Sequence, residues 1–237
     1  MGNGASNDEY AIPTQIGNSD WKSVSAGHDH SMGITSTGAL WVWGANDYGQ
    51  IGNGSTSAHA STSIVVDGVS SWKVAVAGKQ HSLAIREDDK LYAWGSREYG
   101  KIGDSGASSG NQLTPIQAGA LNDTWIAIAA GDNHSLGIKS DHSLYAWGNN
   151  DHGQLGGSIT GGQSYNSPQL AGAGWQSVFA GNFHSLGVLD NGGIWAWGRN
   201  NRGQIGNGST GASASANILG TWKTASAGGL FSIAVRE

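Results

Sequence analysis

The stretch WIAIAAGDNHSLGIKSDHSLYAWGNNDHGQLG, residues 125–156, decides the fold because close copies of it fill the chain. It contains four phrases in a fixed order: W-x-x-x-x-A-G, H-S, W-G and G-Q-L-G. The opening tryptophan recurs at a spacing of roughly fifty residues, at Trp21, Trp72, Trp125, Trp175 and Trp222. Such a period is the sequence signature of a repeat architecture.

All eleven tryptophans belong to these units. Five open a unit, and four more precede the glycine of the W-G phrase: Trp43, Trp94, Trp147 and Trp197. The last two, Trp41 and Trp195, lie two residues before a W-G tryptophan, where other copies hold Tyr92 and Tyr145. Large rings at fixed positions are typical of a packed core, because each ring carries much apolar area.

Each unit reads as short β-strands. Leu136 and Ile138 show the alternation of a strand with one buried face, and the other copies repeat it. A further strand is expected before each opening tryptophan, near residues 13–16, 63–66, 115–117, 168–170 and 217–219. Proline in three of these places them at a sheet edge, where a missing N–H does no harm. Three or four antiparallel strands per unit predict one propeller blade per unit.

The phrases A-G-x-x-H-S-L, L-Y-A-W-G and G-Q-I-G-N-G resemble the repeats of the regulator-of-chromosome-condensation family of β-propellers. The texture, rich in Ser, Thr, Asn and Gly, resembles its phage and bacterial members. The resemblance covers nearly the whole chain and implies a single β-propeller domain over residues 1–237. It also implies that the activity is binding of other macromolecules, and it leaves the partner open.

The number of units departs from that family, whose rings usually have seven blades. Five opening phrases are followed by only four W-G phrases, and Gly2-Asn3-Gly4 matches the unit ending Gly52-Asn53-Gly54. We expect an all-β propeller of five blades, with one incomplete blade closed by the terminal segments 11–16 and 222–235. The alternatives are an open arc or piece of a longer ring, and a strand supplied by a partner chain. An imperfectly closed fifth blade would offer its edge for strand-mediated self-association.

Composition narrows the class of partner. The net charge is -5 and charged residues make up 12% of the chain, which argues against a nucleic-acid surface. No apolar run approaches the roughly twenty residues of a membrane span, and the first residues lack a signal-peptide core. We therefore expect neither nucleic acid nor membrane as a partner, and the compartment stays open.

The recurring histidines are the most tempting chemistry. A symmetric set of imidazoles suggests a metal site, and the four copies are His30, His81, His134 and His184. The fifth copy is Phe231, and an apolar ring can replace a packing histidine but not a ligand. We interpret the histidine as a turn residue whose ring nitrogen bonds backbone, and expect no metal or cofactor. No acid–base pair in a cleft is specified either, so we expect no catalytic residue and no enzyme.

Binding is predicted in the four-residue loop between W-G and G-Q-I-G, which varies freely between units. Flanking glycines should start and end each loop alike, so the loops should gather on one face. The candidate binding residues are Asp47, Tyr48, Arg97, Glu98, Tyr99, Asp151, His152, Arg199, Asn201 and Arg202. Tyr and Arg are enriched at protein interfaces.

We therefore expect a non-enzymatic scaffold that binds another protein or its own copies, with a virion structural or decoration role as the concrete form. The alternatives are a carbohydrate-binding propeller lectin, in which tyrosines such as Tyr48 and Tyr99 hold sugar, and a regulatory or inhibitory protein-binding module.

Overall fold

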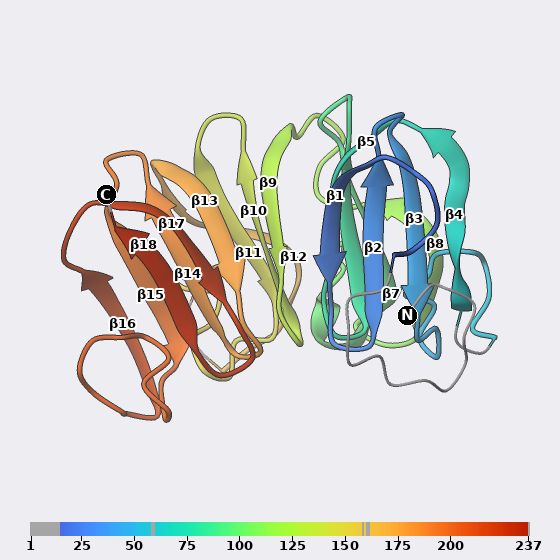
Figure 1. Cartoon of the computed structure of the whole chain (residues 1–237). Helices are drawn as coiled ribbons and strands as arrows, with labels where there is room; N and C mark the ends of the chain where they lie inside the picture. Colours follow the sequence, from blue (N-terminus) through green and yellow to red (C-terminus); the bar gives the residue numbers. More distant parts are fainter. Residues whose placement is uncertain (1–14, 58–59, 158, 160–161, 237) are drawn as a thin grey trace.

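The chain folds into five consecutive antiparallel sheets set around one axis (Figure 1). The structure is a computed structural model that describes residues 15–57, 60–157, 159 and 162–236. Four sheets have four strands each and the fifth has two. We number them unit 1 to unit 5 in chain order. The all-β propeller predicted from the repeats is confirmed.

The strands follow the sequence phrases. Unit 1 contains β1 (Trp21–Ala26), β2 (His30–Thr35), β3 (Ala39–Gly44) and β4 (Ala60–Ser70). Unit 2 contains β5 (Trp72–Ala77), β6 (His81–Arg86), β7 (Leu91–Ser96) and β8 (Asn111–Gln117), with the short 3-10 helix η1 (Glu98–Gly100) after β7. Unit 3 contains β9 (Trp125–Ala130), β10 (His134–Lys139), β11 (Ser143–Gly148) and β12 (Tyr165–Ala173). Unit 4 contains β13 (Trp175–Ala180), β14 (His184–Leu189), β15 (Ile194–Arg199) and β16 (Ser213–Ile218), and unit 5 contains β17 (Trp222–Ala227) and β18 (Ser232–Arg236).

Within each four-stranded unit the strands pair in chain order, so the opening-tryptophan strand and the fourth strand form the two edges. The predicted edge position is confirmed for two of the three prolines, since Pro115 lies in β8 and Pro168 in β12, whereas Pro13 lies outside the described residues. In the described part of the chain, no helix is long and apolar enough to cross a membrane.

The core lies between neighbouring units. Trp94 of unit 2 is fully buried, and its indole Nε1 donates to the backbone oxygen of Gln50 in unit 1 at 2.9 Å. Gly52 follows with a positive φ of +82°, and a Cβ there would lie 2.7 Å from the Trp94 Nε1. Trp147 and Trp197 bond in the same way to the preceding unit's G-K-I-G and G-Q-L-G segments. Each of these segments therefore packs against the tryptophan of the next unit and accepts its indole hydrogen bond.

The recurring histidine also joins neighbouring units. His134 Nε2 lies 2.9 Å from the Ser185 hydroxyl of unit 4, and that hydroxyl donates to the Gln154 backbone oxygen at 2.8 Å. Because the serine gives its one proton to the carbonyl, the imidazole Nε2–H is the donor to the serine. The same arrangement repeats at His30–Ser82, His81–Ser135 and His184–Ser232. Our interpretation is corrected in one respect, since the ring nitrogen bonds a serine hydroxyl rather than backbone.

Burial keeps these imidazoles neutral. Desolvation lowers the pKa of His134 to about 3, and it lowers the pKa of His30 and of His184 to about 4. Phe231, in the fifth copy, is 64% exposed. The sequence predicts that an apolar ring can replace the histidine where two units meet. The exposed ring of Phe231 gives no support to this prediction.

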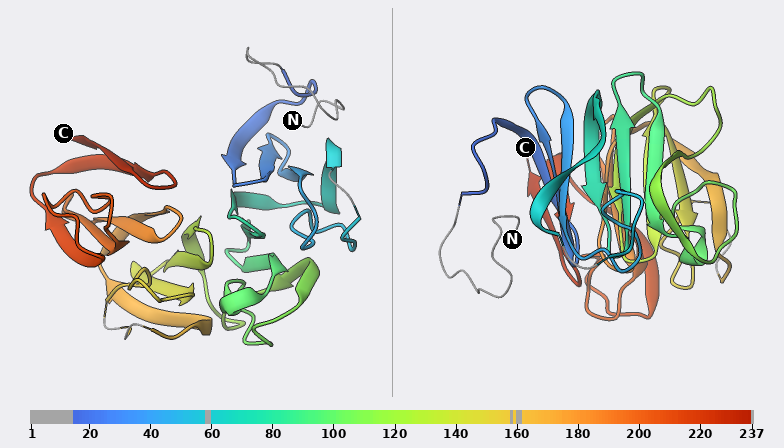
Figure 2. Two further views of the ribbon diagram at one scale, coloured as in Figure 1. Left: turned by 90° about the horizontal axis from the view of Figure 1, so that it is seen from below. Right: turned by 90° about the vertical axis from the view of Figure 1, so that its right-hand side faces the viewer.

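The units form an arc rather than a closed ring within the described residues (Figure 2). Seen along the axis, β1 and β18 lie at the two ends of this arc, on either side of an opening. Val24 on β1 is 72% exposed, whereas Ile128, at the same position of unit 3, is 6% exposed.

The expected closure by the terminal segments is corrected accordingly. β17 pairs with β18 alone among the described strands. Residues 11–14 of the proposed closing segment lie outside the described residues. The described part turns to unit 1 instead, where the backbone oxygen of Ile16 accepts a hydrogen bond from Trp21 Nε1 at 3.4 Å.

Candidate binding face

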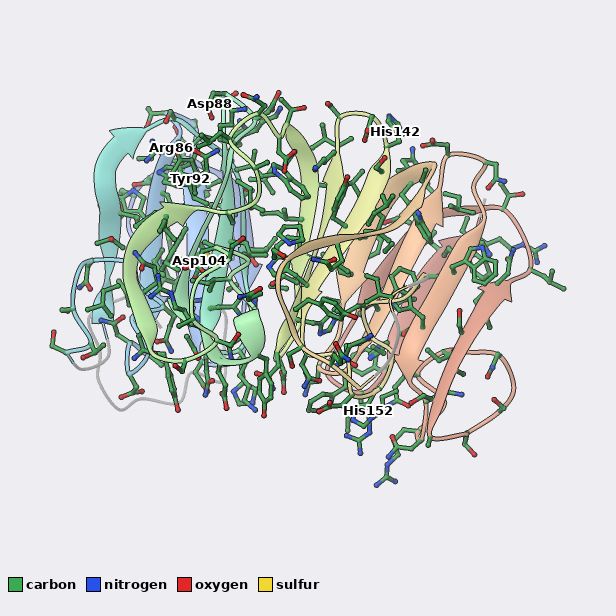
Figure 3. All side chains as sticks on the ribbon, turned by 180° about the vertical axis from the view of Figure 1, so that it is seen from behind. Arg86, Asp88, Tyr92, Asp104, His142 and His152 are labelled. Atoms are coloured by element: carbon green, nitrogen blue, oxygen red, sulfur yellow. The ribbon has the colours of Figure 1, made fainter. Side chains whose placement is uncertain are left out.

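The variable loops gather at one end of the blades, as predicted. In unit 1 the Ala45 N–H donates to the backbone oxygen of Asp29 at 2.8 Å, which places the loop after W-G beside the A-G turn. Units 2 to 4 repeat this bond. Figure 3 shows His152 at this end and His142 and Asp88 at the other. We call this end the loop face, made of residues 27–29, 45–48, 78–80, 96–99, 131–133, 149–152, 181–183 and 199–202.

Backbone hydrogen bonds join the A-G turns of successive units around the axis. The Lys79 N–H donates to the Gly131 oxygen and the Asp132 N–H to the Asn182 oxygen, at 3.3 and 3.2 Å. The turns enclose an axial hollow of about 350 Å³. Lys79 and Asp132 in its wall form an ion pair at 3.3 Å. The hollow therefore opens on the loop face, and the lysine and the aspartate in its wall neutralise each other.

The second loop position is structural. In unit 1 the Asn46 side-chain oxygen accepts from the Ile51 N–H at 3.1 Å, and its amide donates to the Ser55 backbone oxygen at 3.0 Å. Asn150 and Asn200 repeat the bond to the following segment. These amides fix the loop from inside.

Arg97 occupies this second position in unit 2. Its Nε and Nη2 contact the Asp104 carboxylate at 3.0 and 2.8 Å, and Nη2 also donates to Gln112 at 2.8 Å. This half-buried arginine lies on the predicted face, and its guanidinium is engaged within its own unit.

The third and fourth loop positions point outward. Asp47, Glu98, Asp151 and Asn201, at the third position, are all exposed. At the fourth position Tyr48 and Arg202 are exposed, while Tyr99 and His152 are half-buried. The remaining predicted residue, Arg199, is half-buried at the first position. The structure thus brings all ten predicted residues to one face, on four separate loops.

Sequence reasoning missed Phe183. Its half-buried ring meets His152 edge-on at 5.8 Å between centroids, and the Arg199 guanidinium carbon lies 5.3 Å from its centroid. The available signal was an aromatic residue directly before the recurring histidine, where units 1 to 3 hold Asp29, Gln80 and Asn133.

Sequence reasoning also missed Lys101, which stands where units 1, 3 and 4 hold glutamine. The residue is fully buried, and its Nζ donates to Asn133 at 2.9 Å and to Gln80 at 3.3 Å. Burial lowers the pKa of Lys101 to about 8. The signal was a lysine inside the otherwise uncharged G-Q-I-G phrase.

Both faces carry ion pairs, and those of the loop face include Lys79–Asp132 and Arg97–Asp104. The opposite face carries the ion pairs Lys73–Asp89 at 2.6 Å and Lys139–Asp123 at 2.7 Å, and His142 Nδ1 lies 2.8 Å from the Asp190 carboxylate. On the loop face, Asp47, Glu98 and Arg202 have no ion-pair partner among the described residues. These unpaired charges lie on the loops that vary between units, so the loop face is the better candidate for binding.

Comparison with known sequences bears out the repeat. The pattern for the regulator of chromosome condensation (RCC1) repeat matches residues 37–85, 88–138, 141–188 and 191–235. The ultraviolet-B receptor UVR8 of Arabidopsis thaliana is 30% identical over 145 residues, which is 60% of this chain and 32% of the receptor. The mitochondrial RCC1 domain-containing protein RUG3 of the same plant is 37% identical over 137 residues, 56% of this chain and 30% of that protein. This chain thus aligns with about a third of these relatives' length.

Among solved structures, Prp20p of Saccharomyces cerevisiae superposes with a TM-score of 0.80 at 23% identity. The match covers 95% of this chain and 58% of Prp20p. At that identity the likeness concerns the fold alone. The repeat matches, which extend over most of the sequence, show that the chain belongs to the regulator of chromosome condensation (RCC1) repeat family.

Proposed function

We propose that the protein is a non-catalytic scaffold that binds another protein through its loop face. The observation that carries this proposal is a set of exposed, unpaired charges on fixed loops that vary between units. Exposed Asp47, Glu98 and Arg202 have no ion-pair partner among the described residues, and they lie on loops that internal hydrogen bonds hold in place. Side chains held in place lose less conformational freedom on binding, which favours affinity.

The relatives support the class of partner. The structure of yeast Prp20p was reported together with its binding to Gsp1p and histones, all proteins. The reported relatives are plant and yeast proteins, so they lend no support to the virion role suggested by the phage-type resemblance. The proposal is therefore limited to protein binding.

One observation favours carbohydrate as a second candidate ligand. Tyr48 is 37% exposed and lies beside the exposed carboxylate of Asp47, the pairing that a sugar ring with hydroxyls would use. Binding to a glycan array that is lost in Tyr48→Ala would favour this candidate.

Site-specific photo-crosslinking tests the main proposal. A benzophenone amino acid is placed at Tyr48, Glu98 or Arg202 on the loop face, and at exposed Asp88 on the opposite face as control. Illumination in the cells that produce the protein should give the same discrete protein adduct from the three loop-face positions and none from Asp88. Adducts from Asp88 alone would contradict the proposal.

A further inference from the structure

The loop of unit 4 differs in charge from the other three. Units 1 to 3 carry an acid at the third loop position and an aromatic ring at the fourth: Asp47–Tyr48, Glu98–Tyr99 and Asp151–His152. Unit 4 carries neutral Asn201 and then Arg202, and it adds Arg199 at the first position. An acid is thus absent at the one place where two arginines come together on a single loop.

The ring of Phe183 contacts both an arginine and a histidine at this loop. The Arg199 guanidinium carbon lies 5.3 Å from the ring centroid of Phe183, and the His152 ring meets Phe183 edge-on with 5.8 Å between centroids. We call His152, Phe183, Arg199 and Arg202 the unit 4 patch.

The guanidinium groups of the patch are available. Arg199 Nε donates to the Asn201 side chain at 3.1 Å, which orients the group. Its two Nη nitrogens, and the whole guanidinium of Arg202, have no hydrogen-bond or ion-pair partner among the described residues. The nearby Asp151 carboxylate accepts a bond from Asn149, at 2.9 Å, within its own loop. Arg97 of unit 2, by contrast, is satisfied by Asp104 and Gln112.

We propose that the unit 4 patch binds an acidic segment of a partner protein, with carboxylates on Arg199 and Arg202 and a neighbouring apolar side chain against Phe183. Arginine guanidinium groups bind carboxylates through paired, charge-assisted hydrogen bonds. A short protein segment can confine its carboxylates to the patch, whereas nucleic acid carries a charge at every nucleotide and would extend over the adjoining acids Asp47, Glu98 and Asp151. A protein segment therefore fits better than nucleic acid. The inference rests on the proposed function and names the chemistry of the partner.

Fluorescence anisotropy with purified protein tests the patch. The probe is a short fluorescein-labelled peptide in which glutamates and aspartates flank one phenylalanine. Replacing both arginines, Arg199→Gln with Arg202→Gln, should weaken binding about tenfold, and Phe183→Ala should weaken it severalfold. Lys223→Gln, which removes a charge from an exposed residue at the start of β17, is the matched control and should change nothing. Added salt should weaken binding, since the contacts are solvent-accessible.

Three outcomes would overturn the inference. The first is equal affinity of the double variant and the Lys223→Gln control, with both shown to be folded by circular dichroism. The second is tighter binding of an oligo-dT strand than of the peptide, with the same dependence on the arginines. The third is concentration-dependent self-association that vanishes in the double variant while no peptide binds, which would make the occupant a second copy.

The two proposals can fail separately. Suppose that Tyr48 and Glu98 give crosslinks but the peptide binds the double arginine variant as tightly as the parent. Protein binding by the loop face would then be supported, and the proposal for the unit 4 patch would be rejected. If peptide binding depends on the arginines but no loop-face position gives a crosslink, the patch would bind acidic peptides and the proposal of a cellular protein partner at the loop face would be rejected.

Discussion

Units 3 and 5 carry the same inner phrases but bury them differently. Leu136 and Ile138 on β10 are completely buried, while Ile233 and Val235, at the same positions on β18, are 62% and 54% exposed. The difference is the neighbour, because unit 4 covers β10 and no described strand follows β18. The comparison teaches that a unit's apolar face is buried by the next unit, so stability is a sum of nearest-neighbour junctions.

The largest effect is expected at a tryptophan that crosses a junction. Trp94→Ala should lower the free energy of unfolding by about 3–5 kcal/mol, as truncation of buried aromatic rings does. Trp43, the same residue in unit 1, is 7% exposed and its indole N–H has no partner among the described residues. Trp43→Ala should therefore cost about 1 kcal/mol less, the value of one hydrogen bond. Urea denaturation checks both, and a loss below about 1 kcal/mol in Trp94→Ala would contradict the junction.

A pair of aliphatic truncations tests the comparison directly. Leu136→Ala should cost about 2–5 kcal/mol because it leaves a cavity at a closed junction. Ile233→Ala, at the matching exposed position, should cost less than about 1 kcal/mol. Similar losses at both positions, measured in the same denaturation series, would show that β18 is covered in solution.

The sequence was sufficient to predict the units, their edge strands and the common face of the loops. Periodicity reveals these features because every copy repeats them, as Trp94 and its equivalents do. The ends of the arc were harder, because the same apolar pattern at Val235 serves a buried or an exposed face. Only the spatial neighbour decides which.

The candidate site was predicted in part for a related reason. Sequence placed Arg97 and Arg199 in equivalent loops. Arg97 is held by Asp104, whereas the Nη groups of Arg199 have no partner in the part of the chain that the structure describes. Whether such an arginine is paired depends on residues distant in the sequence, such as Asp104, which are not part of the repeated phrases. Phe183 was overlooked because it lies outside the loops that sequence reasoning singled out, although it replaces the polar residue that units 1 to 3 hold there.

The histidine junction predicts a dependence on acid. The pKa of His134 is about 3 in the folded protein, against an ordinary value of 6.5. Between pH 3 and pH 6.5 this histidine is therefore protonated in the unfolded chain and neutral in the folded chain. The stability from this neutral histidine is complete above pH 6.5 and falls by about 1.4 kcal/mol per pH unit below it.

His134→Gln keeps an N–H donor for Ser185 but does not titrate. Its stability should therefore fall by about 2 kcal/mol less than that of the parent between pH 6.5 and pH 5. Denaturation curves at both pH values measure this, with exposed His28→Gln as the control. Identical acid slopes in His134→Gln and the parent would mean that the imidazole is not held neutral. Phe231 gives no guidance here because its ring lies outside any closed junction.

The smallest expected effect distinguishes one junction from its equivalents. Lys101 brings a charge into a buried position where units 1, 3 and 4 have glutamine, and burial lowers the pKa of Lys101 from 10.5 to about 8. Below pH 8 both the folded and unfolded states hold the proton, so the cost of burying the charge is present in full and is relieved as pH rises from 8 to 10.5. Lys101→Gln should remove the cost of burying this charge. The new glutamine should also accept a hydrogen bond from the Tyr99 N–H, as Gln50 does from the Tyr48 N–H. The substitution loses the hydrogen bonds from Lys101 to Gln80 and Asn133. We expect a net gain of about 1 kcal/mol at pH 7 and a smaller rise in stability between pH 8 and pH 10 than in the parent. A variant less stable than the parent at pH 7 would show instead that the lysine's two amide contacts outweigh its burial, and that this junction is stabilised by a charge its neighbours lack.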